Sequence, residues 1–177
     1  FIIINNLMKQ IFLHEPYFFN DEIKNLRQCI KSGWVSTGGK FVSDFEKKLS
    51  TFTKTNHAVA LNSGTSALDL SLKSLSLNEG DEIIVPTITF IAPINVVIYN
   101  RCKPIFMDTD NFGNLDVSKL GEFLENNTFK RGKHTINKST KNIIKAVIVV
   151  HVFGNLADVI NIKKICKKKN IVVIEDA

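Results

Sequence analysis

The segment Asn62-Ser63-Gly64-Thr65-Ser66-Ala67-Leu68 places hydroxyl groups where a bound anion would need hydrogen-bond donors. It lies between an expected strand and an expected amphipathic helix, and Gly64 permits a tight turn before Thr65 and Ser66. The free N–H groups and partial positive charge of a helix N-terminus favour phosphate. Because Ser and Thr also cap helices that bind nothing, phosphate binding and plain capping are equally open. The Walker and dinucleotide fingerprints, Gly-Lys-Ser/Thr and G-x-G-x-x-G, do not occur here.

A second candidate is the carboxylate pair Glu175-Asp176, which follows the apolar run Ile171-Val172-Val173-Ile174. Such a run is typical of a buried strand in a parallel sheet, and open α/β sheets bind ligands beyond the carboxyl ends of their strands. Asp176 is therefore expected at a functional edge. There it could hold a metal, act as a base or pair with a protonated heteroaromatic nitrogen. The alternative is that it caps a following helix.

Three further segments offer side chains for a ligand. Phe90 ends Pro86-Thr87-Ile88-Thr89-Phe90, directly after an expected strand, and could lie against a flat ring or belong to the core. His151 also follows a strand and could touch a ligand, although a lone histidine in such a place is more often structural. The glycine-rich loop Gly33–Gly39 could line a pocket or merely connect two helices; its candidates for binding are Trp34, Thr37 and Gly38.

The elements that must position these residues alternate along the chain between short apolar runs and amphipathic segments. Alternation of this kind predicts an α/β fold in which helices flank a mainly parallel sheet. Ser118 is expected to cap its helix, Pro93 to interrupt its helix, and the polar residues 126–142 to form an exposed loop. Helices are expected at 20–31, 42–53, 65–75, 91–99, 118–125 and 156–169, and strands at 58–61, 82–85, 104–107, 144–150 and 171–174.

Composition excludes several classes of protein. The net charge is +6, but the densest basic cluster lies on one expected helix without interleaved aromatic residues, which disfavours nucleic-acid binding. The three cysteines have no metal-ligand or disulfide spacing, so no metal site is expected and a reducing cytoplasm fits. No apolar run approaches the length of a membrane span. The cluster comprises Lys163, Lys164, Lys167, Lys168 and Lys169.

Taken in order, five motifs resemble one known family, the DegT-type nucleotide-sugar aminotransferases. The motifs are Gly-Trp-Val-Ser-Thr-Gly-Gly, Asn-Ser-Gly-Thr-Ser-Ala-Leu, Pro-Thr-Ile-Thr-Phe-Ile-Ala, Val-His-Val-Phe-Gly-Asn and Ile-Glu-Asp-Ala. These enzymes have fold type I and depend on pyridoxal 5'-phosphate. The resemblance runs from about Gln10 to Ala177. It implies that the chain is an incomplete fold-type-I aminotransferase large domain.

The resemblance also implies roles for the matching residues. Thr65 and Ser66, with the turn at Gly64, would hold the cofactor phosphate. Phe90 would stack on the pyridine ring, and Asp176 would pair with the pyridine nitrogen and favour its protonated form. The loop from Trp34 to Gly39 would lie near the sugar.

The same resemblance sets expectations for the extent of the fold. Residues 1–9 are expected to be an N-terminal extension outside it, and residues 10–177 the N-terminal part of the cofactor-binding large domain. The rest of that domain and a small C-terminal domain would lie outside the chain. The family's catalytic lysine would follow Ala177, and none is assigned among residues 1–177. The chain by itself is therefore expected to be inactive.

The function implied is transfer of an amino group from glutamate to a nucleotide-linked 4-keto-6-deoxy sugar, in the biosynthesis of surface polysaccharide or glycan sugars. The insertion at 126–142 resembles most the branch that acts on UDP-linked sugars. A cytoplasmic homodimer is expected, with no nucleic-acid or membrane partner. Two alternatives remain: a sugar dehydratase of the same fold, in which histidine replaces the catalytic lysine, and a non-catalytic remnant.

Overall fold

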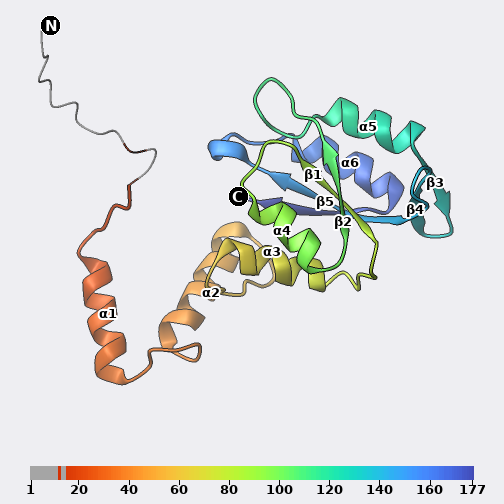
Figure 1. The fold of residues 1–177 in the computed structure, drawn as a ribbon. Helices are drawn as coiled ribbons and strands as arrows, with labels where there is room; N and C mark the ends of the chain where they lie inside the picture. Colours follow the sequence, from red (N-terminus) through yellow and green to blue (C-terminus); the bar gives the residue numbers. More distant parts are fainter. Residues whose placement is uncertain (1–11, 13–14) are drawn as a thin grey trace, which may run out of the picture. The chain divides into compact units, whose positions relative to one another are not determined.

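The computed structural model describes residue 12 and residues 15–177, which divide into two compact units that meet in sequence at Ala60 and Leu61. Figure 1 shows the chain coloured along its length. The expectation that residues 1–9 lie outside the fold falls outside the described residues.

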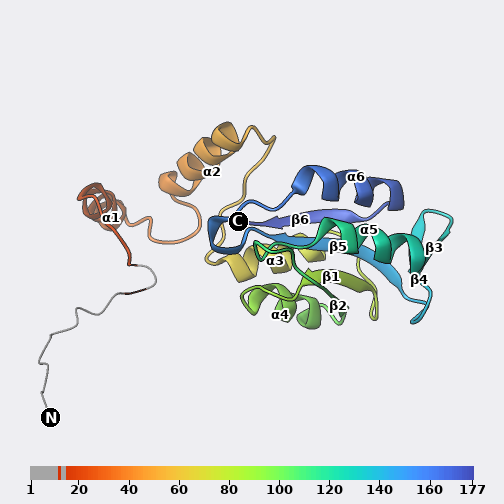
Figure 2. The ribbon, with the colours of Figure 1, turned by 90° about the horizontal axis from the view of Figure 1, so that it is seen from above.

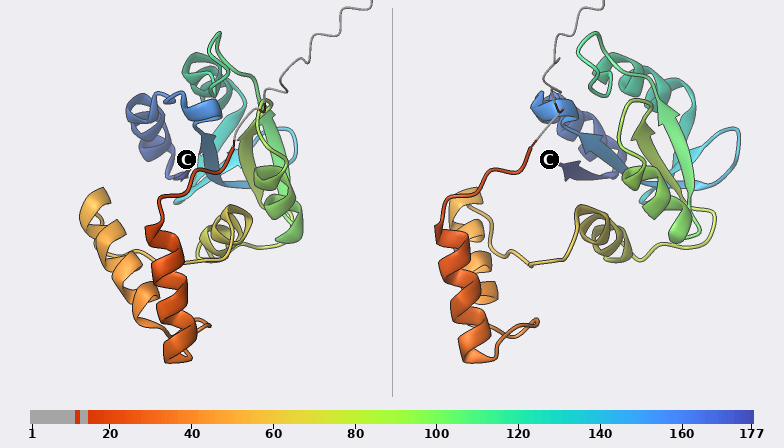
Figure 3. Two further views of the ribbon diagram at one scale, coloured as in Figure 1. Left: turned by 90° about the vertical axis from the view of Figure 1, so that its left-hand side faces the viewer. Right: turned by 60° about the vertical axis from the view of Figure 1, so that its left-hand side comes forward.

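The first unit consists of two helices, α1 (Asp21–Ser32) and α2 (Lys40–Thr53), joined by the glycine-rich loop (Figure 3). Gly33 ends α1 in the left-handed conformation at φ 74°, and its N–H donates to the Ile30 carbonyl. Both predicted helices are confirmed. Within these two described helices no side chain is buried, although each carries an apolar face.

The second unit is built on a six-stranded sheet in the order β2-β1-β5-β4-β3, with β6 also pairing with β5. Strands β2, β1, β5 and β6 run parallel, which confirms the predicted α/β fold with a mainly parallel sheet. The strands are β1 (Glu82–Pro86), β2 (Lys103–Met107), β3 (Thr128–Arg131), β4 (His134–Asn137), β5 (Ile143–Val150) and β6 (Val172–Asp176).

Helices cover both faces of this sheet, as Figure 2 allows the reader to follow. One apolar core joins the sheet to α3 (Gly64–Lys73) and α4 (Ala92–Tyr99). The other joins it to α5 (Val117–Asn126) and α6 (Val159–Lys169). Successive side chains of a strand point to opposite faces, and the two cores follow that alternation. Val149 and Val173 belong to the α5/α6 core, whereas Ile148 and Ile174 belong to the α3/α4 core.

The predicted loop at residues 126–142 is wrong, because strands β3 and β4 form an antiparallel hairpin there. Gly132 makes the turn at φ 60°, and β4 pairs with the first residues of β5. Each of these strands has only four residues, which is too short for an alternation of apolar and polar residues to indicate a strand. The buried amide of Asn137 donates to Glu82 Oε2 at 2.9 Å, so one of the polar residues that suggested a loop lies inside the fold.

Two other expectations for strands are wrong. Residues 58–61 do not form a strand, and Val59 is 65% exposed. A short apolar run is not sufficient, because a strand also needs a neighbour to complete its hydrogen bonds. The last strand exists, but it is only partly buried, with Val172 44% exposed. Among the described strands β6 pairs only with β5, so its other edge is open.

The remaining corrections concern helix starts. Pro93 does not interrupt α4 but lies in its first turn, where the missing N–H costs nothing. Asp116, not Ser118, caps α5, and its Oδ1 accepts the Ser118 N–H at 2.8 Å. Helix α6 begins at Val159 after the cap Asp158, three residues later than predicted. Along residues 12 and 15–177, no helix has the length and apolar character that crossing a membrane requires.

Candidate functional site

The start of α3 presents unpaired backbone donors. Ser63 is the N-cap, and its Oγ accepts the Ser66 N–H at 3.2 Å. The Ser66 N–H is therefore occupied, and sequence reasoning missed Ser63, whose place in a Ser-x-x-Ser spacing signalled the cap. The N–H groups of Gly64 and Thr65 have no hydrogen-bond partner within residues 15–177. A helix N-terminus with free donors attracts an anion.

Gly64 is the first residue of α3 and does not make the predicted tight turn, so that reason for the glycine is wrong. Its φ is not in the left-handed region, and a Cβ built on it would meet no atom within 4 Å. The fold therefore accepts a side chain at this position. The space that a Cβ would enter, directly before the free N–H groups, is open to a ligand.

Asp176 ends β6 and, by the alternation of the strand, lies on the same face as Ile174, toward α3 and α4. Figures 1 and 2 both show the end of β6 at the end of the sheet where α3 begins. Burial raises the pKa of the Asp176 carboxyl above its ordinary 3.8. A cationic group bound beside this carboxyl would favour its ionised form.

Phe90 lies in the loop between β1 and α4 and is 78% exposed, so the interpretation that its segment alone favoured, a core residue, is wrong. The neighbouring Thr89 Oγ1 is buried without a hydrogen-bond partner in the part of the chain that the structure describes. Strands β1 and β6 both flank β5, so their ends lie about 10 Å apart. That separation suits a ring-sized ligand reached by Phe90 from one strand and Asp176 from the other.

His151 lies on the opposite face of the sheet from Asp176. Its Nδ1 accepts the Ala157 N–H at 3.1 Å, and its Nε2 lies 3.6 Å from Glu175 Oε2. Lys163, from α6, reaches Glu175 Oε1 at 2.6 Å. The structure therefore places His151 beside Glu175, and Glu175 beside Lys163 of α6. Sequence reasoning did not find the contact between His151 and Glu175, because it depends on the register of β5 against β6.

The loop candidates Trp34, Thr37 and Gly38 belong to the first unit. Trp34 is 59% exposed, and its ring lies over Gly38, where an added Cβ would come within 3.2 Å of Cζ3. A side chain at position 38 would push the exposed ring back by a few tenths of an ångström. An apolar pocket in this unit is lined by Trp34 together with residues of both helices, among them Leu26, Cys29 and Phe41.

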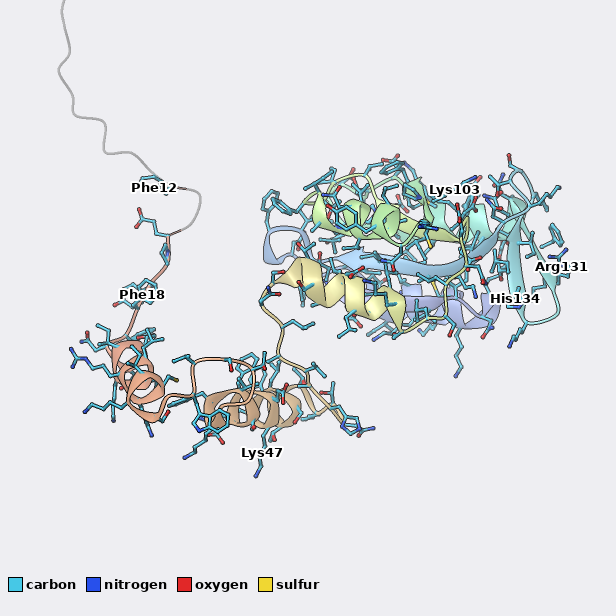
Figure 4. All side chains as sticks on the ribbon, turned by 60° about the horizontal axis from the view of Figure 1, so that its bottom comes forward. Phe12, Phe18, Lys47, Lys103, Arg131 and His134 are labelled. Atoms are coloured by element: carbon cyan, nitrogen blue, oxygen red, sulfur yellow. The ribbon has the colours of Figure 1, made fainter. Side chains whose placement is uncertain are left out.

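Figure 4 shows all described side chains, with Arg131 and His134 marking the hairpin at the far end of the sheet from the start of α3. Near that start, the free donors of α3 and the partly buried carboxyl of Asp176 lie on the same face of the sheet. The model of the DegT/DnrJ/EryC1/StrS aminotransferase family matches residues 17–177.

The chain belongs to this family. It is 35% identical over 164 residues to GDP-perosamine synthase of Vibrio cholerae, a match that covers 93% of this chain and 41% of that protein. The chain thus spans about two fifths of the length of the curated relatives it matches. That relative is named for a GDP-linked sugar rather than a UDP-linked one.

Solved structures of other DegT family members share the fold. An aminotransferase from Psychrobacter cryohalolentis superimposes with a TM-score of 0.76 at 28% identity, covering 93% of this chain and 38% of that one. The E. coli GDP-4-keto-6-deoxy-D-mannose-3-dehydratase, solved with bound hydrated PLP, gives 0.76 at 25% identity, covering 93% and 40%. These matches confirm the fold predicted for a DegT family member. Since one is an aminotransferase and the other a dehydratase, the fold alone does not separate the two reactions.

Proposed function

We propose that the protein carrying these residues is a pyridoxal 5'-phosphate-dependent aminotransferase that acts on a nucleotide-linked 4-keto-6-deoxy sugar, with glutamate as the amino donor. The reaction would serve polysaccharide or glycan sugar biosynthesis. The observation that carries the proposal is the placement of free N–H donors at Gly64 and Thr65 on the same face of the sheet as Asp176. The similarity to GDP-perosamine synthase supports the substrate class.

The residues at this edge fit the cofactor. The N–H groups of Gly64 and Thr65 and the hydroxyl of Ser66 would hold the phosphate, and the open space at Gly64 lets it approach the backbone. Phe90 would lie against the pyridine ring, and Asp176 would stand at the ring nitrogen. When bound, pyridoxal 5'-phosphate supplies an electron sink for the carbanion that forms as a proton leaves the substrate.

Asp176 has a definite task in this arrangement. Burial alone pushes its carboxyl toward the neutral form, which cannot hold a cation. Beside a protonated ring nitrogen, Asp176 would instead be held as the carboxylate, and it would in turn keep that nitrogen protonated.

The loop with Trp34, Thr37 and Gly38 would line the sugar site, since its exposed indole offers a flat surface to a ligand. The described cysteines are unpaired, which fits a protein of the reducing cytoplasm. We place the complete enzyme there as a homodimer.

A dehydratase is the second candidate, favoured by the match to the E. coli GDP-4-keto-6-deoxy-D-mannose-3-dehydratase. One assay separates the two. The natural full-length protein is loaded with pyridoxal 5'-phosphate and given glutamate, then GDP-4-keto-6-deoxymannose. We expect glutamate to bleach the cofactor absorbance, and mass spectrometry to find an amino sugar and 2-oxoglutarate in equal amounts.

Two other results of this assay would contradict the aminotransferase. A 3-deoxy sugar without amino product would replace the aminotransferase by the dehydratase. A protein that never binds the cofactor would refute both. The variant Asp158→Asn serves as the control, because the exposed Asp158 caps α6 and asparagine caps equally well.

A further inference from the structure

The imidazole of His151 is enclosed although it follows directly after the strand edge where ligands bind. Its side chain is only 9% exposed. The backbone N–H of Ala157, in the segment before α6, donates to Nδ1 at 3.1 Å. On the other side of the ring, Nε2 lies 3.6 Å from Glu175 Oε2. Both ring nitrogens therefore face protein groups.

The bond from Ala157 decides where the imidazole proton is. A backbone N–H can only donate, so Nδ1 must present a lone pair, and the proton of the neutral ring then lies on Nε2. The Nε2–H faces a carboxylate, which favours this arrangement. Lys163 holds the other oxygen of that carboxylate at 2.6 Å, so Glu175 is oriented from both sides.

The same residue is also attached to the candidate cofactor site through the backbone. The His151 N–H donates to the Asp176 carbonyl at 3.0 Å, in line with the pairing of Val150 with Asp176. His151 thus contacts two consecutive residues of β6, Glu175 by its side chain and Asp176 by its main chain. Since Asp176 ends the strand, this bond is the last backbone contact between β5 and β6.

We propose that His151 is a positioning residue, held as its Nε2–H tautomer between Ala157 and Glu175, which fixes Asp176 at the sheet edge from the opposite face of the sheet. The proposal rests on the proposed function only for what Asp176 binds. It replaces the expectation that His151 could touch a ligand, because the side chain is only 9% exposed and its Nδ1 already accepts the Ala157 N–H.

The tautomer is tested first, and it does not depend on any cofactor. The natural protein is labelled with nitrogen-15 in histidine, and the ring signals of His151 are identified by their loss in His151→Gln. We expect a protonated Nε2 and an unprotonated Nδ1 at neutral pH. A proton on Nδ1 would overturn the proposal, whether or not the protein binds pyridoxal 5'-phosphate.

The positioning role is tested by binding. In His151→Leu we expect about tenfold weaker affinity for pyridoxal 5'-phosphate, the effect of one lost hydrogen bond. Affinity for inorganic phosphate should not change, because the proposed phosphate site at the α3 N-terminus does not involve His151. His151→Asn keeps an oxygen that can accept the Ala157 N–H, so we expect a smaller loss of about threefold. Lys167→Met is the matched control, since Lys167 lies on α6 and Lys163, not Lys167, pairs with Glu175.

Several outcomes decide against the proposal. Unchanged cofactor affinity in a folded His151→Leu protein would show that the residue positions nothing. If His151→Leu does not fold, Lys163→Met provides the second test, with an expected loss of about threefold and the same phosphate control. The wild-type protein could show the Nε2–H tautomer and yet fail to bind the cofactor. That result would refute the proposed function, but it would still support the placement of His151 between Ala157 and Glu175.

Discussion

At the carboxyl ends of the strands, the two faces of the sheet differ in whether their polar groups have partners. On the α3/α4 face, two backbone donors at Gly64 and Thr65 lack partners in the described chain, and Phe90 is exposed. On the α5/α6 face, His151 and Glu175 both have partners. Polar groups that lack hydrogen-bond partners at one place in a fold are typical of a ligand site. Neighbouring polar groups that have partners are typical of the residues that hold such a site in position. The following variants test that division.

The largest effect is expected for Asp176→Asn. Asparagine fills the same space but carries no charge for the ring nitrogen, so we expect kcat to fall at least about a hundredfold, as when a single charge-stabilising group is removed from an active site. Steady-state kinetics of the natural protein measure it, with Asp158→Asn as the control. A fall of less than about threefold would remove Asp176 from the site.

The same variant should make the ligand-free protein more stable, which a purely structural residue would not do. The folded-state pKa of Asp176 is raised, so the folded state keeps its proton longer than the unfolded state. The wild type therefore loses stability as pH rises above 3.8 and through the folded pKa, and asparagine avoids that loss. At pH 7 we expect a gain below about 1 kcal/mol in urea unfolding, because the carboxyl is only partly buried.

Gly64→Ala comes next. The fold has room for the methyl group, so we expect the free energy of unfolding to stay equal or to rise by up to about 1 kcal/mol. The methyl group would occupy the space before the free N–H groups, and affinity for pyridoxal 5'-phosphate should fall about tenfold. Equilibrium dialysis measures the binding. Unaltered affinity would mean that the phosphate lies elsewhere.

Ile162→Val tests the other face. Ile162 is fully buried in the α5/α6 core, and removal of one methylene should cost about 1 kcal/mol in urea unfolding. Affinity for the cofactor should not change, because this face only supports the site. A loss of cofactor affinity larger than that of Gly64→Ala would contradict the division between the two faces.

The smallest effect is expected for Phe90→Leu. The exposed ring contributes little to folding, so the unfolding midpoint should stay within error of the wild type. Loss of stacking on the cofactor should weaken binding about threefold. Isothermal titration calorimetry is sensitive enough to see it. A marked fall in stability without weaker binding would show that Phe90 packs rather than binds.

The sequence predicted those parts of the fold that depend on neighbours along the chain. The capped helix at α3, the strand at β5 and the order of the ligand-bearing motifs could be read from local spacing. The hairpin at β3 and β4 could not, because four-residue strands are stable only through their partner β5. For the same reason, an apolar run at 58–61 without a partner strand does not form one.

For the candidate site, the sequence offers residue types but not their geometry. Thr65, Phe90 and Asp176 follow from motif and position, since strand ends and helix starts can be located along the chain. The pairing of His151 with Glu175 could not be predicted, because it needs the register of β5 against β6. Which face of the sheet a residue occupies is likewise decided by tertiary packing, and this separates His151 from Asp176.

The hairpin of β3 and β4 limits where the last strand, β6, can pair with β5. Strand β4 occupies the beginning of one side of β5 at Ile143 and Ile144, so β6 can begin its pairing only at Ala146. The side chain of Asn170, the residue two before β6, donates to the Lys133 carbonyl of the hairpin turn at 2.7 Å. A slip of β6 by one residue would exchange Glu175 and Asp176 between the two faces. A polar hairpin at the other end of the sheet thus helps to fix which of two adjacent carboxylates faces α3 and α4.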